Sequence, residues 1–198
     1  DYKMINLRGN HCDWFKTWLD TGVHPTSWLQ GGEGTLKSYC KALNKEYVPK
    51  YSGYTTNLLP SDIPSSHIGF FKNQKLYHLD HNSRFYVHGG FDRRQYIDYL
   101  TATEPYNFYW DRDLWSQALS CTEGVKLKTN DDFNEIFIGH TATVHLDRTL
   151  EPVNSGGVWN LDQGAGWVGK LTIMNVETKE YFQSDLSTTL YPNEKGRG

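Results

Sequence analysis

The sequence predicts an α/β fold, bordering on α+β, built as a layered sandwich of mixed β-sheets flanked by helices. Short apolar runs of strand length alternate with helix-like stretches in the first part of the chain. From Val158 onward the pattern is strand, turn and strand. No repeat, linker or low-complexity tract interrupts the 198 residues. We therefore expect a single domain over residues 1–198.

Three of the predicted strands share a pattern in which Gly and His follow an apolar run at once. Residues 4–7 lead into Gly9, Asn10 and His11, residues 85–87 lead into His88, and residues 136–138 lead into Gly139 and His140. Each run has the length and β-rich content of a buried strand. Glycine at the end of such a run indicates a sharp turn and allows the backbone to approach a ligand closely.

Helices and hairpins are predicted between and after these strands. Aromatic residues within 13–19 recur at i,i+4 spacing, and Gly22 offers a stop. Weaker helical patterns cover residues 34–43 and 111–119. Residues 77–87 are predicted to form a hairpin around the polar turn 80–83. In the tail we expect strands over 159–161, 170–174 and 180–182, with a turn at 177–179.

Charge and composition exclude several classes of protein. Lys and Arg number 20 against 23 Asp and Glu, a net charge of −3, which argues against nucleic-acid binding by phosphate neutralisation. No apolar run approaches the roughly 18 residues that a membrane span needs. Cys12, Cys40 and Cys121 are too few and too scattered for a disulfide framework or a zinc ribbon. We expect a cytoplasmic, globular protein with neither nucleic acid nor membrane as partner, and the sequence leaves its oligomeric state open.

Aromatic residues make up 15% of the chain, with 7 Trp and 13 Tyr. Such an excess is typical either of a stacking platform for carbohydrate or single-stranded nucleic acid, or of a core built from aromatic rings. Trp14 and Trp18 lie one helical turn apart, on one predicted buried face. This spacing favours the core over a binding module with exposed tryptophans.

The polar residues that follow the strands suggest a functional site. Asn10, His11, His88 and His140 all emerge from predicted strand ends, and such ends converge on one edge of an α/β sheet. Neutral imidazole nitrogens together with an amide oxygen suit a transition metal such as Mn, Fe or Zn. Three histidines in the same local context, each within two residues of a glycine, favour a metal site over isolated structural histidines.

Five short motifs contain these residues and their neighbours. They are residues 6–11 (NLRGNH), 86–90 (YVHGG), 109–112 (YWDR), 137–141 (FIGHT), and 160–167 (NLDQGAGW) followed by 169–171 (GKL). In this order they resemble the G-N-H-E/D, V-H-G-G, W-x-R, G-H-T and D-T-G-A…G-x-L motifs of calcineurin-like metallophosphoesterases. The match is to the serine/threonine phosphoprotein phosphatase type of the bacterial and phage enzymes.

The resemblance implies a role for each matching residue. Asn10, His88 and His140 would bind the second metal of a dinuclear centre of Mn, Fe or Zn. His11 would protonate or stabilise the leaving alkoxide, and Arg112 would hold the phosphate through its planar guanidinium. The implied substrate is a phosphoprotein or a small phosphoester, and a dinucleoside polyphosphate is the alternative.

The sequence also departs from the family pattern. The D-x-H and G-D-x-x-D-R motifs, which bind the first metal, do not occur in the 198 residues, so the chain is expected to correspond to the C-terminal two-thirds of a family domain. Alone it should bind metal weakly and turn over poorly or not at all. The alternative is a non-catalytic pseudo-phosphatase that binds a partner or a phosphorylated ligand through Arg112. Cys12 stands where the family has an acidic residue, and Asp13 is expected to cap the following helix.

Overall fold

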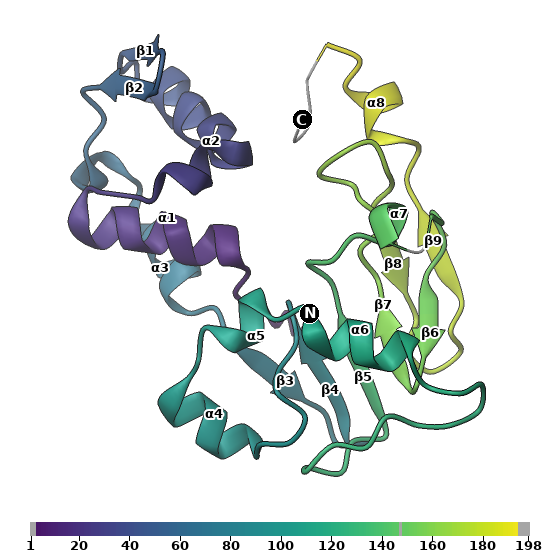
Figure 1. Cartoon of the computed structure of the whole chain (residues 1–198). Helices are drawn as coiled ribbons and strands as arrows, with labels where there is room; N and C mark the ends of the chain where they lie inside the picture. Colours follow the sequence, from purple (N-terminus) through teal and green to yellow (C-terminus); the bar gives the residue numbers. More distant parts are fainter. Residues whose placement is uncertain (1–2, 147, 194–198) are drawn as a thin grey trace. The chain divides into compact units, whose positions relative to one another are not determined.

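The computed structural model of the chain describes residues 3–146 and 148–193, and these divide into two compact units. We call residues 10–74 the helical unit, and residues 3–9 with 75–193 the sheet unit. Figure 1 shows the helices and strands of both units. The expectation of a single domain stays a prediction. None of the described helices is long and apolar enough to cross a membrane.

The helical unit combines three α-helices with one short hairpin. Its elements are α1 (Asn10–Thr21), η1 (Thr26–Trp28), α2 (Leu29–Ala42), β1 (Tyr47–Lys50), β2 (Gly53–Thr56), η2 (Pro60–Asp62) and α3 (Ser65–Lys72). As predicted, α1 ends before Gly22, whose φ of +74° suits a left-handed stop and whose N–H donates to Trp18 O at 2.7 Å. Asp13 was expected to be the N-cap, which is wrong: the helix begins at Asn10, so Asp13 lies in its first turn.

The core of the helical unit consists mainly of aromatic rings. Phe15 is 2% exposed and packs against Trp18, Trp28, Tyr39 and Phe71 with ring centroids 4.7–5.7 Å apart. Such ring pairs add to the hydrophobic gain from burial. The prediction that the aromatic excess builds a core is confirmed here.

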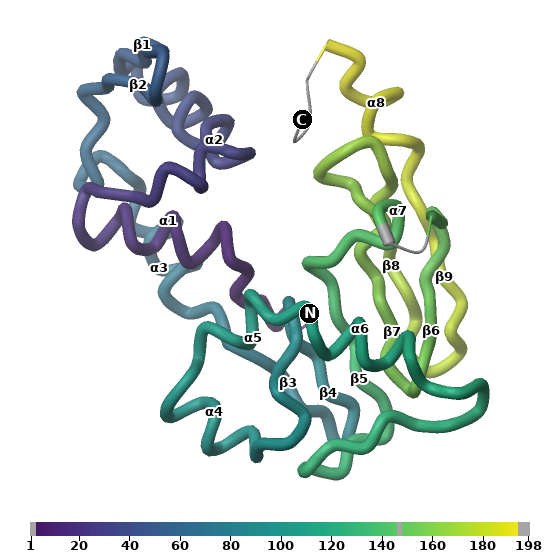
Figure 2. The backbone as a smooth tube through the Cα atoms, viewed as in Figure 1, coloured from purple at the N-terminus to yellow at the C-terminus, as the bar shows by residue number. Residues whose placement is uncertain are grey.

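The sheet unit contains the five-stranded sheet. Its elements are β3 (Tyr77–Leu79), β4 (Arg84–Val87), α4 (Ile97–Thr103), α5 (Asn107–Trp110), α6 (Asp113–Leu119), β5 (Glu135–Ile138), α7 (Thr143–Leu146), β6 (Val153–Ser155), β7 (Val158–Asn160), β8 (Thr172–Met174), β9 (Tyr181–Gln183) and α8 (Ser187–Leu190). The strand order is β3-β4-β5-β7-β6, with β4, β5 and β7 parallel and the two edge strands antiparallel. The chain leaves β4, passes through α4, α5 and α6, and returns to β5, as Figure 2 shows.

The sequence predicts most of these elements correctly. The hairpin over 77–87, the strands that precede His88 and His140, the α6 helix and the strands of the tail are all present. The class of a mixed α/β protein with flanking helices is therefore confirmed. The remaining strands form two separate two-stranded pairs, β1 with β2 and β8 with β9.

The strand expected over residues 4–7 is wrong. Only Leu7 makes a bridge, to Lys75, and Met4 is 79% exposed. Hydrogen bonds from Arg8 N to Lys75 O and from Lys75 N to Asn6 O hold the segment. A strand needs a continued ladder and a buried face. Here the helix that begins at Asn10 ends the pairing after one bridge.

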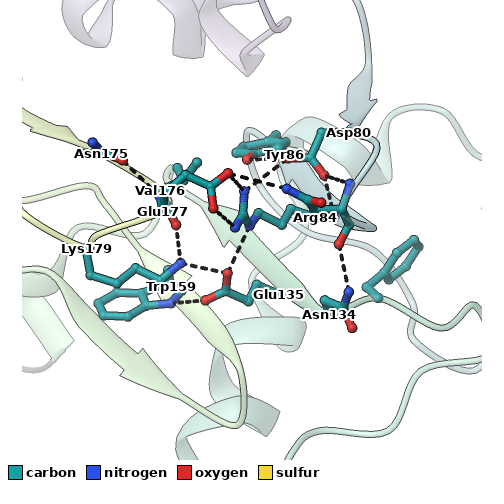
Figure 3. Close-up of polar contacts among 12 residues, drawn as sticks. Asp80, Arg84, Tyr86, Asn134, Glu135, Trp159, Asn175, Val176, Glu177 and Lys179 are labelled. Carbon is teal, nitrogen blue, oxygen red and sulfur yellow. Dashed lines mark hydrogen bonds and ion pairs between the residues drawn. The ribbon is translucent and has the colours of Figure 1, made fainter.

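Polar contacts join the sheet to the turn between β8 and β9 (Figure 3). The Arg84 guanidinium donates to both carboxylate oxygens of Glu177, at 2.5 and 2.6 Å, and to Glu135 at 3.2 Å. Glu135 also accepts hydrogen bonds from Lys179 Nζ at 2.6 Å and from Trp159 Nε1 at 3.0 Å. Two acidic and two basic side chains thus link β4, β5 and β7 to the hairpin turn.

Candidate functional site

His88 and His140 lie side by side at the carboxyl ends of two parallel strands. His88 directly follows β4, and His140 follows β5 after Gly139. The N–H of Gly139 donates to His88 O at 2.9 Å, which joins the two strand ends. The two imidazole centroids are 5.1 Å apart, with the ring planes inclined at 53°. Of the four residues expected at one edge of the sheet, His88 and His140 lie at the ends of adjacent parallel strands, whereas the strand expected before Asn10 and His11 does not form.

A strained turn orients the His140 ring. His140 has a φ of +64°, a left-handed conformation that side chains other than glycine rarely adopt. The N–H of Thr141 donates to Gly139 O at 2.6 Å across this residue. Trp110 packs edge-on against the His140 ring, with centroids 5.6 Å apart, and His140 Nε2 is buried. Backbone strain of this kind is common at functional sites.

Arg112 reaches the same turn from the residue that precedes α6. Its Nη1 donates to His140 O at 3.1 Å and to Thr141 Oγ1 at 3.0 Å. Arg112 is an exposed residue although this nitrogen is held against the turn. The structure therefore brings Arg112 together with one of the two neighbouring histidines.

Two glycines explain how the Arg112 segment can lie so close to His88. A Cβ atom at Gly89 would be 3.1 Å from backbone atoms of Tyr109, Trp110 and Asp111. At Gly90 it would be 2.4 Å from Asp111 Oδ1. Asp111 in turn accepts a hydrogen bond from Leu114 N at 3.0 Å and so caps α6. Burial raises the pKa of the Asp111 carboxyl, and this backbone hydrogen bond opposes the shift.

The G-N-H motif begins at Gly9, beside His88, and its next two residues belong to the helical unit. A Cβ atom at Gly9 would lie 2.9 Å from Cε1 of His88, so the glycine backbone rests against the imidazole. Asn10 is the first residue of α1 and is 7% exposed. His11 packs edge-on against Trp14, with ring centroids 5.0 Å apart. These two predicted site residues belong to the helical unit.

Thr141 and Asn160 were not among the predicted site residues, although both support the turn. Asn160 ends β7, is completely buried and donates from Nδ2 to Thr141 O at 2.8 Å. Thr141 is 6% exposed. The burial of this amide and its place beside the strand that precedes His140 are tertiary features, so no local sequence pattern signals this role.

Cys12 and Asp162, which lies within the 160–167 motif, have structural roles. Cys12 accepts a hydrogen bond from Gln74 Nε2 at 3.4 Å, as a packed thiol. Asp162 accepts one from Gly164 N at 2.9 Å, and its Cβ would be 3.7 Å from a Cβ at Gly139. Its position after β7 places it near the strand end that carries His140.

The donors fit a transition metal in part. With metal–nitrogen bonds of about 2.0–2.1 Å, two imidazoles on one ion have ring centroids roughly 4.5–5.2 Å apart. The separation of 5.1 Å falls in this range. Within residues 3–146 and 148–193, no group of three or more His, Cys, Asp or Glu side chains could hold a metal ion. The expected set of Asn10, His88 and His140 contains only two residues of those types.

No family model matches the chain, and no curated protein matches it.

Proposed function

We propose that this protein is a metal-dependent phosphomonoester hydrolase of the serine/threonine phosphoprotein phosphatase type, with a metallophosphoesterase-like fold. The observation that carries the proposal is the pair of His88 and His140. They stand 5.1 Å apart at the carboxyl ends of adjacent parallel strands, a spacing that suits joint coordination of one ion. The neighbouring Arg112 supplies the positive charge that a phosphate requires.

In this proposal the residues divide the work of hydrolysis. Asn10, His88 and His140 would hold one of the two divalent ions, Mn, Fe or Zn, that the resemblance implies. Bound metal would polarise the phosphoryl oxygens and lower the pKa of a coordinated water. Arg112 orients the phosphate through its guanidinium. His11 gives a proton to the departing alkoxide oxygen, which makes the alcohol a better leaving group.

The substrate in this proposal is a phosphoprotein or a small phosphoester. The motif residues serve a dinucleoside polyphosphate equally well, which is the alternative substrate. The net charge of −3 disfavours an extended nucleic acid.

A second candidate is a non-catalytic protein that binds a phosphorylated ligand. It is favoured by Arg112, which is exposed while Thr141 and the His140 carbonyl fix one of its nitrogens. Such a protein would bind orthophosphate without turning over an ester.

The test is hydrolysis of p-nitrophenyl phosphate with added Mn²⁺, together with calorimetric Mn²⁺ binding, in the longest chain that the gene encodes. His88→Ala and His140→Ala should each abolish turnover and weaken Mn²⁺ binding at least tenfold. His81→Ala, at an exposed position in the turn between β3 and β4, is the matched control and should change neither. Absence of metal binding and turnover in the wild-type protein would exclude the hydrolase.

The 198-residue chain measured alone should turn over poorly or not at all. Neither D-x-H nor G-D-x-x-D-R occurs in it, and these motifs bind the first metal in the family that the chain resembles. Robust turnover by this chain would contradict the expectation.

A further inference from the structure

We propose that Thr141 and Asn160 are positioning residues that hold the Arg112 guanidinium in the orientation in which it binds a phosphoryl group. This inference rests on the proposed function, because it concerns the same site. It assigns a role to two uncharged residues.

The first step is the contact between Arg112 and Thr141. Arg112 Nη1 donates to Thr141 Oγ1 at 3.0 Å and to His140 O at 3.1 Å. Both acceptors belong to one turn, so the same nitrogen is held at two points. Since the guanidinium is planar, anchoring one nitrogen at two points restricts the plane of the whole fork.

The second step fixes the turn itself. Asn160 Nδ2 donates to Thr141 O at 2.8 Å, and its Oδ1 accepts from Asp162 N at 3.0 Å. Asn160 is completely buried and pairs in register with Ile138 of β5. A buried side chain with both polar ends hydrogen-bonded has little freedom to move. The chain of contacts therefore runs from the sheet through Asn160 and Thr141 to Arg112.

The third step is the consequence for binding. An exposed arginine has many rotamers, and ordering it at the moment of binding costs conformational entropy. The Thr141 hydroxyl reduces this cost because it orders the guanidinium before the phosphate arrives. Loss of the hydroxyl should therefore weaken phosphate binding while the metal-binding histidines stay in place.

The experiment uses the longest chain that the gene encodes and compares Thr141→Val, which keeps the shape but removes the hydroxyl, with Thr141→Ser, which keeps the hydroxyl. The readouts are KM for p-nitrophenyl phosphate, kcat, and the inhibition constant of orthophosphate. Thr141→Val should raise KM and the inhibition constant about five- to tenfold, with a smaller change in kcat. Thr141→Ser should keep wild-type values. Partial unfolding would instead lower kcat at an unchanged KM.

A double-mutant cycle isolates the coupling between the two residues. Arg112→Ala should raise the inhibition constant at least as much as Thr141→Val, and adding Thr141→Val to Arg112→Ala should have no further effect. Additive effects, a wild-type inhibition constant in Thr141→Val, or failure of Thr141→Ser to restore binding would overturn the inference. Arg112→Lys keeps the charge but removes the planar guanidinium. Because position 112 is exposed, this variant still tests the inference if a Thr141 variant does not fold. A wild-type inhibition constant in Arg112→Lys would also overturn it.

The two proposals fail in different ways. A wild-type protein that hydrolyses the ester, with Thr141→Val unchanged, overturns the positioning role alone. A wild-type protein that binds orthophosphate by calorimetry without turnover overturns the hydrolase. In that case a weaker affinity in Thr141→Val still supports the positioning role, and an equal affinity overturns it. Absence of both turnover and orthophosphate binding overturns both.

Discussion

At the scale of single residues, His140 lies in the candidate site and has an unfavourable backbone conformation. Its φ of +64° is costly for a residue with a Cβ atom. The turn that imposes this conformation also places the imidazole beside His88. The hydrogen bonds from Arg112 and Asn160 to the turn offset part of the cost.

This strain can be measured by comparing two substitutions that both remove the imidazole. His140→Gly should be more stable than His140→Ala by about 1 kcal/mol, because glycine adopts the left-handed conformation without a Cβ clash. The free energy of unfolding in urea measures the difference. At His88, which has no positive φ, the order should be reversed, with His88→Ala the more stable. An alanine variant at 140 as stable as the glycine variant would show that the turn relaxes without strain.

The sequence identifies His88 and His140 correctly as neighbours, because each lies within two residues of the end of a short apolar run that forms a parallel strand. It does not identify the support that these residues receive. The roles of Thr141 and Asn160 depend on the order β5-β7 in the sheet, and no local pattern encodes that order. The conformation of His140 is equally hidden, since a positive φ is rare for histidine and only the completed turn imposes it.

At the scale of elements, close packing joins the V-H-G-G and W-x-R motifs. The turn after β4 lies against the backbone that leads into α6, and the absence of side chains at residues 89 and 90 permits this approach. Asp111 occupies the space beside Gly90 and caps α6 at the same time. Any side chain at residue 90 would therefore disturb the start of α6 and the residue before it, Arg112.

Gly90→Ala should destabilise the protein by about 1–3 kcal/mol, the usual cost of overpacking a filled site. The reason is that its Cβ would meet Asp111 Oδ1 at 2.4 Å and Leu114 Cβ at 3.0 Å. Gly139→Ala is the matched control, because a Cβ there meets its neighbours at 3.6 and 3.7 Å, ordinary van der Waals distances. Thermal unfolding of both variants checks the prediction. Equal midpoints in the two variants would contradict it.

Glu135 makes the stability of the sheet unit depend on pH. Burial tends to raise the pKa of its carboxyl, but hydrogen bonds from Lys179, Trp159 and Arg84 outweigh burial and lower the pKa below the ordinary 4.5. A lowered pKa in the folded state stabilises the protein above pH 4.5, and this contribution is lost as the pH falls through the folded-state pKa.

Glu135→Gln should therefore cost about 1–2 kcal/mol of unfolding free energy at pH 7. The difference from wild type should shrink as the pH falls below 4.5. Urea unfolding at pH 7, 5 and 3.5 measures it. Glu180→Gln, at an exposed position near the same hairpin turn, should have little effect at any pH. A cost of Glu135→Gln that does not change with pH would show that the charge of Glu135 contributes nothing.

At the scale of the whole molecule, the chain builds two aromatic cores. Phe15 lies at the centre of the core of the helical unit. In the sheet unit, Phe85 is completely buried and packs against Tyr77, Phe91 and Phe133. The composition predicts that aromatic rings fill a core. It cannot predict two cores, because the grouping of buried residues depends on tertiary contacts between segments distant in the sequence.

Substitutions in the two cores should act locally. Phe15→Ala and Phe85→Ala should each cost about 3–5 kcal/mol, as for other buried phenylalanines. Phe15→Ala should reduce protection from amide hydrogen exchange mainly in residues 10–74, and Phe85→Ala mainly in residues 75–193. Hydrogen exchange followed by mass spectrometry of both variants measures this. An even loss of protection across both units would show that the cores unfold as one.

The parallel pairing of β4 with β5 has a consequence for variation in length. His88 and His140 lie at the carboxyl ends of these two strands. The chain must therefore return to the amino ends of the strands before β5 begins. The returning segment between α6 and β5, residues 120–134, therefore approaches the sheet at the end remote from the two imidazoles. Insertions at its exposed residues 122–125 should leave the separation of the imidazoles unchanged. The topology thus allows the length of this connection to change without a change in the separation of the His88 and His140 imidazoles.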